Sequence, residues 1–296
     1  MILNPPKSNQ TISKEPPSAS LVKALADAGQ MEIARELEKR FLGKKISTIM
    51  PSVTTEEWLL KFLTQDERML ALKEHVRKLA NRKEPVLITG ETGTGKELLA
   101  HALHGSRSGN FVDINCAGMP ENLIESELFG HTQGAFTGAV KETTGLIAAA
   151  ADGTLFLDEV GDLAYPLQAK LLRLIQENVY RQVGGTKNLP ATCRIVAATH
   201  WPLHRCIASS DQKIPDGPKF RDDLYARLST FELNTTPLRA RLDDIPLILD
   251  MLDPEQKFPR NVDWSNTPLP FNVRSLQRIV ARHNVLGISP FNVKEL

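Results

Sequence analysis

The chain has 296 residues, of which 41% are hydrophobic and 24% charged, and its formal net charge is +1. This length favours one large domain with a smaller one, and the near-neutral charge excludes recruitment of nucleic acid by the field of the whole protein. The three cysteines, Cys116, Cys193 and Cys206, have no paired spacing and indicate free thiols in a reducing compartment. Since no apolar stretch is long enough for a membrane span and no secretion signal is apparent, we expect a cytoplasmic protein with no membrane contact.

The N-terminal fifth of the chain has two compositions. Residues 1–20 are rich in Pro, Ser, Lys and Asn, which predicts disorder because such a segment buries little apolar surface. Residues 21–54 carry apolar side chains at helical spacing that Gly29 interrupts, and they predict a short helical segment that docks on a partner. Residues 55–81 form a further amphipathic helical stretch.

From Pro85 the chain alternates short apolar runs with helical patterns, which predicts a parallel sheet covered by helices on both faces. We expect this α/β domain to span 55–236. The final segment, 237–296, has no strand pattern and predicts a small helical unit with helices near 243–252 and 273–283. The expected strands are 86–89, 111–114, 154–158 and 194–199, and the expected helices of the α/β domain are 96–104, 120–129, 166–177 and 219–228.

A glycine-rich loop between the first strand and the next helix predicts a phosphate site. Its glycines let successive backbone N–H groups turn toward one anion, and the helix N-terminus adds partial positive charge. Lys96 supplies a point charge for the β- and γ-phosphates, while Glu97 stands where a Ser or Thr usually contacts Mg²⁺. The nucleotide-binding residues predicted here are Gly90, Glu91, Thr92, Gly93, Thr94, Gly95, Lys96 and Glu97.

Downstream, the apolar run 154–157 ends in Asp158 and Glu159. Asp158 at the end of a buried strand is suited to hold Mg²⁺, directly or through water. Glu159 is then placed to orient and deprotonate an attacking water. Together with the loop, the pair predicts ATP hydrolysis with ATP and Mg²⁺ as the cofactors.

A glycine-bracketed hexapeptide lies between these two motifs. It contains an aromatic and a hydroxyl residue but no charge, and a core strand would not carry two glycines so close together. The pattern indicates an exposed tip that contacts something, and the alternative is a turn with Phe136 buried. The six residues are Gly134, Ala135, Phe136, Thr137, Gly138 and Ala139.

In this order the motifs resemble the AAA+ ATPase domain of bacterial sigma-54-dependent transcription activators, over about residues 55–283. Glu97 is usual in that family. The resemblance implies a three-layer P-loop AAA+ fold with a helical lid and a homo-oligomeric ring, expected to be a hexamer. It also implies that the ring remodels sigma-54-bound RNA polymerase, with the 134–139 hexapeptide contacting sigma-54 through Phe136 and Thr137.

The resemblance assigns further roles residue by residue. It pairs Asn115 with the catalytic Glu159, and it places Thr199 in the strand that senses nucleotide state. His200 follows Thr199 where the family usually has Asn, and we expect it and His204 to be surface residues, since a metal site would need an acidic partner.

The same resemblance identifies Arg221 and Arg227 as the arginines that a subunit offers to its neighbour's nucleotide, 183–186 as a second loop beside the hexapeptide, and Arg274 as the phosphate-sensing arginine of the lid.

The chain also departs from the family. Pro270 and Phe271 precede Asn-Val-Arg where the family has Pro-Gly, and the lid is shorter than expected. We find no receiver domain and no helix-turn-helix, so we expect no DNA-binding domain in this chain. Two other functions stay open: an AAA+ ATPase that remodels another partner, and an inactive decoy subunit that poisons activator rings.

Overall fold

The computed structural model describes residues 53–207 and 217–287. Every described residue belongs to one compact unit of the chain. The prediction of disorder over 1–20 lies outside the described residues, and so does the helical segment predicted over 21–54, except for its last two residues.

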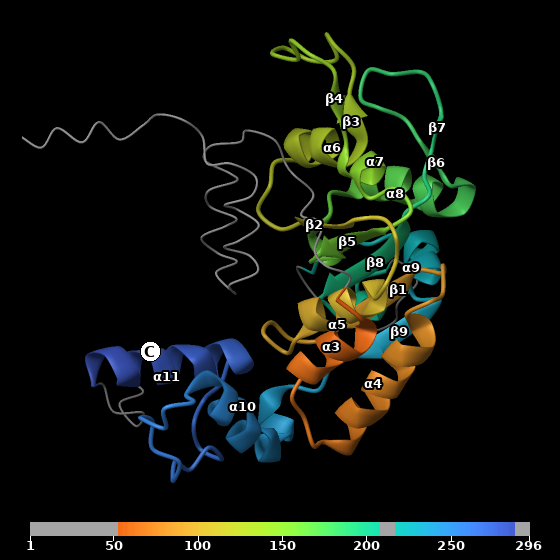
Figure 1. Cartoon of the computed structure of the whole chain (residues 1–296). Helices are drawn as coiled ribbons and strands as arrows, with labels where there is room; N and C mark the ends of the chain where they lie inside the picture. The colour runs from red at the N-terminus through yellow and green to blue at the C-terminus, as the bar shows by residue number, and fades with distance from the viewer. Residues whose placement is uncertain (1–52, 208–216, 288–296) are drawn as a thin grey trace, which may run out of the picture. The chain divides into compact units, whose positions relative to one another are not determined.

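A five-stranded parallel sheet forms the centre of the α/β domain, in the order β2-β5-β8-β1-β9 (Figure 1). The four predicted strands are all present, and three of them have the predicted bounds. The fifth strand, β9, was not predicted; it is an edge strand that buries only one side chain, Leu233. The strands are β1 (Val86–Thr89), β2 (Phe111–Asn115), β5 (Thr154–Asp158), β8 (Arg194–Thr199) and β9 (Phe231–Asn234).

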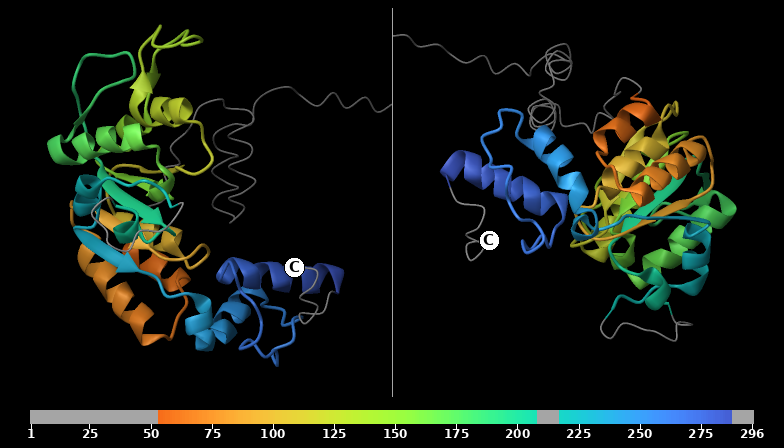
Figure 2. Two further views of the ribbon diagram at one scale, coloured as in Figure 1. Left: turned by 180° about the vertical axis from the view of Figure 1, so that it is seen from behind. Right: turned by 90° about the horizontal axis from the view of Figure 1, so that it is seen from below.

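Helices cover both faces of this sheet, which confirms the predicted three-layer AAA+ fold (Figure 2). Successive strand residues point to opposite faces, so Leu155 and Leu157 of β5 pack in one apolar cluster and Phe156 packs in the other. One cluster includes side chains of α6 (Glu121–Phe129), α7 (Leu146–Ala149), α8 (Tyr165–Glu177) and α9 (Asp222–Leu228). The other includes side chains of α3 (Thr55–Lys61), α4 (Glu67–Leu79) and α5 (Lys96–His104).

The helical stretch expected over 55–81 is two helices. Thr54 caps α3 in a reciprocal arrangement with Glu57, and the Asp66 side chain caps α4 by accepting from the N–H groups of Arg68 and Met69. Each cap satisfies N–H groups that have no partner inside their helix, which fixes where the two helices begin.

The lid has its own apolar core, in which Phe258, Ile248 and Leu276 are buried. It contains two predicted helices, and α11 continues three residues beyond its expected end, to the left-handed Gly287. In the described part of the chain, no helix is long and apolar enough to cross a bilayer. The lid elements are η4 (Leu238–Ala240), η5 (Leu242–Asp244), α10 (Ile245–Leu252) and α11 (Val273–Leu286).

Two small hairpins project from the α/β domain beside each other (Figure 1). One joins β3 (Gly130–His131) to β4 (Thr143–Thr144) and carries the hexapeptide; the other joins β6 (Val179–Tyr180) to β7 (Leu189–Pro190). The Thr132 N–H donates to the carbonyl of Val183 at 3.0 Å, which places the expected second loop beside the first.

Candidate nucleotide-binding site and contact loop

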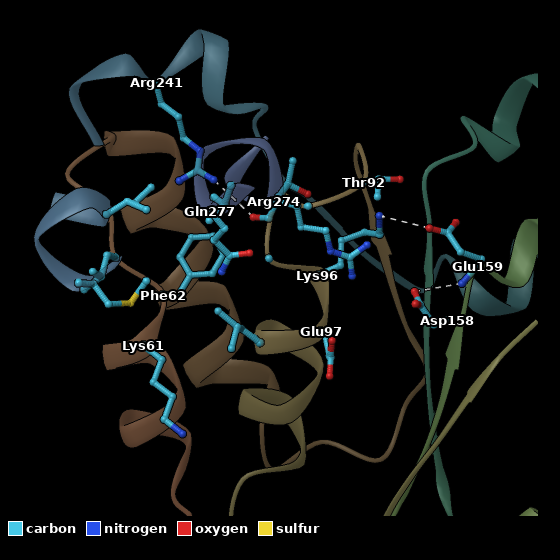
Figure 3. Close-up of a pocket in the computed structure, with 18 residues that line it drawn as sticks. Lys61, Phe62, Thr92, Lys96, Glu97, Asp158, Glu159, Arg241, Arg274 and Gln277 are labelled. Atoms are coloured by element: carbon cyan, nitrogen blue, oxygen red, sulfur yellow. Dashed lines mark hydrogen bonds and ion pairs between the residues drawn. The ribbon is translucent and has the colours of Figure 1, made fainter. Parts of the chain in front are cut away.

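A cavity of about 280 Å³ lies between the glycine-rich loop, the end of β5 and the lid (Figure 3). It brings together most of the predicted nucleotide residues: positions 92–97, Asp158, Glu159 and Arg274. Its apolar walls were not predicted. They come from the end of α3 and from the lid, namely Phe62, Leu63, Ile248, Met251 and Val273.

Close packing around the glycines shapes the loop. Gly93 and Gly95 have φ values of +79° and +103°, which favour glycine. A Cβ atom on Gly93 would lie 2.1 Å from the Phe271 carbonyl oxygen, and one on Gly95 would lie 2.5 Å from the Phe62 ring. A side chain at either position would therefore separate the loop from the lid or from α3.

Lys96 begins α5 and is buried, with its ammonium group at the cavity. Its Nζ donates to the carbonyl oxygens of Gly90 and Glu91 at 2.8 and 3.2 Å and lies 3.7 Å from Glu159 Oε1. Burial lowers the pKa of Lys96, and the charges of Glu159 and Asp158 oppose that shift. The ammonium group at the helix N-terminus suits a phosphate ligand.

The two acids differ in their surroundings. Burial, followed by the charge of Glu159, raises the pKa of Asp158. Asp158 Oδ1 accepts a hydrogen bond from the Glu159 N–H at 3.1 Å, and Glu159 itself has a left-handed backbone with φ of +51°. Mg²⁺ prefers carboxylate oxygens as ligands, and a buried carboxylate is stabilised in its charged form by a nearby cation. Asp158 therefore fits the predicted metal role.

Glu159 has a different partner from the predicted one. Asn115 does not pair with it; the Asn115 Oδ1 accepts from the N–H of Ala117 at 2.8 Å, as a local turn does. Instead, Glu159 Oε2 lies 2.6 Å from His200 Nδ1 and 3.0 Å from the His200 backbone nitrogen.

Both histidines are exposed, as predicted, but the expectation that neither has an acidic partner is wrong for His200. His204 lies in η3 (Leu203–Arg205), whereas His200 follows β8 and faces two acidic side chains. Glu159, Asp162 and His200 each place one ligand atom within 4.8 Å of the others.

The predicted Thr199 is fully buried at the end of β8, outside the lining of the cavity. Its hydroxyl accepts a hydrogen bond from the Trp201 N–H at 3.1 Å. Gly90, at the start of the loop, is joined to the same strand end, because its N–H donates to the Thr199 carbonyl at 3.2 Å. In this structure Thr199 therefore contacts the glycine-rich loop through its backbone carbonyl, and its contact with nucleotide stays a prediction.

The lid is bonded directly to the glycine-rich loop through Asn272, which sequence reasoning missed. Its side chain is fully buried, accepts from the Leu238 N–H at 2.6 Å, and donates to the Thr92 carbonyl at 3.0 Å and to Glu91 Oε2 at 3.2 Å. Arg239 adds a two-pronged ion pair to Glu91 at the surface. The sequence motif Asn-Val-Arg was interpreted through Arg274, but Asn272, two residues earlier, makes the hydrogen bonds that join the lid to the loop.

A buried ion pair also fixes the lid entry. Arg241 Nη1 lies 2.8 Å from Asp244 Oδ2, and both side chains are almost inaccessible. Asp244 further accepts from the Thr64 hydroxyl and the Gln65 N–H, each at 2.7 Å. Because both charges have several hydrogen-bond partners, the pair can be buried without an uncompensated charge.

The predicted arginines, Arg221 and Arg227, lie outside the cavity of their own chain. Arg221 precedes α9 and does not lie within it as predicted; its guanidinium contacts Asp223 at 2.8 Å and lies 5.7 Å from the centre of the Tyr165 ring. Arg227 lies in the last turn of α9 and is exposed.

The hexapeptide is an exposed tip, which excludes the alternative of a buried Phe136. Phe136 is 47% exposed, and its ring packs against the His131 ring in an edge-on arrangement with ring centres 5.0 Å apart. Gly134 and Gly138 have φ values of +80° and +101°, and the Gly134 N–H donates to the Ala139 carbonyl at 2.9 Å. The bond closes the tip and leaves Thr137 exposed with Phe136.

Comparison with known proteins places the chain in a family. The model of the family described as "Sigma-54 interaction domain" matches residues 62–234, more than half of the chain. The chain belongs to this family. The transcriptional regulatory protein GlrR of Escherichia coli K12 is 45% identical over 202 residues, which are 67% of this chain and 44% of GlrR. The response regulator protein PilR of Pseudomonas aeruginosa is 42% identical over 75% of this chain and 51% of PilR. The chain thus spans about half the length of these curated relatives.

Solved structures agree with the family. NtrX from Brucella abortus, crystallised in complex with ADP, has a TM-score of 0.66 and 28% identity over 93% of this chain and 60% of the NtrX chain. RuvB of Thermotoga maritima, with a TM-score of 0.51 and 14% identity, shares the fold alone. The match to the sigma-54 interaction domain model covers residues 62–234 and therefore ends before the lid begins.

Proposed function

We propose that this chain is an ATPase that activates transcription by sigma-54 RNA polymerase, hydrolysing ATP in a ring and passing the resulting movement to sigma-54. The observation that carries the proposal is the pairing of a cavity lined by Lys96, Asp158 and Glu159 with an exposed glycine-bracketed tip in a sigma-54 interaction domain. The ADP complex of NtrX supports nucleotide binding at the corresponding fold.

ATP fits the cavity by its chemistry. Lys96 and the N–H groups at the start of α5 face the phosphates, and Arg274 of the lid lines the same cavity. The apolar wall of Phe62, Ile248 and Met251 suits a flat base. Mg²⁺ held by Asp158 would neutralise phosphate charge when bound, and Glu159 would take the proton of the attacking water.

The ring is proposed from the arginines. A guanidinium beside the γ-phosphate stabilises negative charge in the transition state, and neither Arg221 nor Arg227 lines the cavity of its own chain. A neighbouring subunit is therefore the proposed source of Arg221 and Arg227. Such an arrangement makes turnover depend on assembly, and the family resemblance suggests a hexamer.

The tip is proposed to bind sigma-54. Phe136 offers an exposed aromatic ring and Thr137 an exposed hydroxyl, on a hairpin held against the second loop at Val183. Aromatic residues are favoured where a small contact must supply affinity. Movement of the β3–β4 hairpin would transmit the nucleotide state of the cavity to sigma-54.

Single-round transcription with sigma-54 polymerase tests the proposal. We expect open complexes only with hydrolysable ATP, and we expect Thr137→Ala to abolish them while ATPase activity is retained. Thr144→Ala, which removes another exposed hydroxyl of the same hairpin, is the matched control and should behave as wild type. ATPase activity without open complexes at any protein concentration would favour remodelling of another partner. Absence of ATPase activity would favour the decoy subunit.

A further inference from the structure

His200 approaches the catalytic carboxylate from outside the cavity. Both its backbone nitrogen and its ring Nδ1 face one oxygen of Glu159, Oε2, at 3.0 and 2.6 Å. The other oxygen, Oε1, faces Lys96 Nζ at 3.7 Å, and Glu159 and Lys96 both line the cavity while His200 does not. One oxygen is thus anchored and the other is directed toward the phosphate side.

The turn that carries His200 is fixed at both ends. The Trp201 N–H donates to the Thr199 hydroxyl at 3.1 Å, and the Trp201 indole N–H donates to Asp162 Oδ1 at 3.0 Å. Gly161 allows this close approach, since a Cβ there would lie 2.8 Å from both the Thr199 hydroxyl oxygen and the Trp201 ring. These contacts fix the backbone from which the His200 imidazole reaches Glu159.

The chemistry of the contact assigns the ring proton. An ionised carboxylate only accepts hydrogen bonds, so the Nδ1 that faces Glu159 Oε2 carries hydrogen. A hydrogen bond to an ionised group is short and about twice as strong as a neutral one. A glutamate has three side-chain torsions, and two donors on one oxygen remove most of that freedom before water arrives.

We infer that His200 is a positioning residue for ATP hydrolysis: it holds Oε2 of Glu159 so that Oε1 faces the attacking water. The inference rests on the proposed ATPase function. It gives a role to the position where the chain departs from the Asn usual in the family. His200 touches neither nucleotide nor water in this account and acts only through Glu159.

Steady-state kinetics separate positioning from binding. We expect His200→Ala to lower kcat about tenfold, which corresponds to about 1.4 kcal/mol in the barrier, with KM for ATP changed less than about twofold. His200→Asn should restore most of kcat, because its amide N–H can take the place of Nδ1–H. His204→Ala, an exposed histidine four residues away, should match wild type.

A spectroscopic readout tests the contact without turnover. In nucleotide-free protein labelled with ¹⁵N-histidine, at about pH 8, we expect the His200 ring to carry its proton on Nδ1, and we expect that signal to move in Glu159→Ala. A proton on Nε2 with Nδ1 bare would overturn the inference. So would an unchanged kcat in His200→Ala, or an equal loss in the Ala and Asn variants. If the wild-type protein shows no ATPase activity at all, the proposed function itself fails.

Discussion

Asn272 offers the sharpest energetic prediction about the lid. Asn272→Ala removes the hydrogen bonds to the Leu238 N–H, the Thr92 carbonyl and Glu91. Glu91 keeps Arg239 as a partner, but two backbone groups lose theirs, and a buried group left without a partner costs about 1–3 kcal/mol. Since Thr92 lines the cavity, water can replace the partner of its carbonyl. The Leu238 N–H then carries the cost, and we expect the free energy of unfolding to fall by about 1–3 kcal/mol.

Equilibrium urea unfolding followed by tryptophan fluorescence measures this loss. Asn272→Gly separates hydrogen bonding from backbone strain, because glycine takes the φ of +51° freely; it should lose nearly as much stability as the Ala variant. Asn266→Ala removes an exposed lid asparagine and should stay within about 0.5 kcal/mol of wild type. Equal, small effects of all three variants would refute the claim that Asn272 fixes the lid on the loop.

Three further outcomes are expected. Glu159→Gln should keep ATP affinity and lower turnover by about 10²–10⁴, as single-turnover assays will report; normal turnover would exclude Glu159 as the base. Arg221→Ala should leave ATP affinity unchanged but lower turnover by about 10³. Wild-type turnover per subunit should rise steeply with protein concentration; turnover independent of concentration would argue against an arginine supplied by a neighbouring subunit. Burial lowers the pKa of His104 to about 4, so the unfolded chain binds one more proton than the folded chain between about pH 6.5 and 4. The free energy of unfolding should therefore decrease as the pH is lowered from about 6.5 to 4, by at most about 1.4 kcal/mol per pH unit. In His104→Gln, the urea midpoint should change less steeply with pH over the same range.

The fold was predictable where local pattern and burial agree. β1, β5 and β8 are apolar runs buried on both faces and bounded by glycine, proline or polar residues, and their predicted bounds match the structure. β9 alternates exposed and buried residues over only four positions at the sheet edge, too short a signal for periodicity to detect.

The site was predictable where its residues belong to local motifs, including Arg274 of the lid. The loop around Lys96 and the Asp158–Glu159 pair carry their chemistry locally, and the cavity brings them together. The contacts of Asn272 with Glu91 and of His200 with Glu159 join residues 181 and 41 positions apart. No local pattern encodes such contacts, because they depend on how the lid and the end of β8 pack.

The most direct test is binding of sigma-54 to this protein as a function of nucleotide state. Light scattering or interferometry should show a stable complex when ADP and aluminium fluoride mimic the γ-phosphoryl group in transfer, and little binding without nucleotide. Phe136→Ala and Lys96→Ala should each abolish the complex, the first at the contact and the second at the nucleotide. Binding that is the same with and without nucleotide, or that survives both substitutions, would contradict the account.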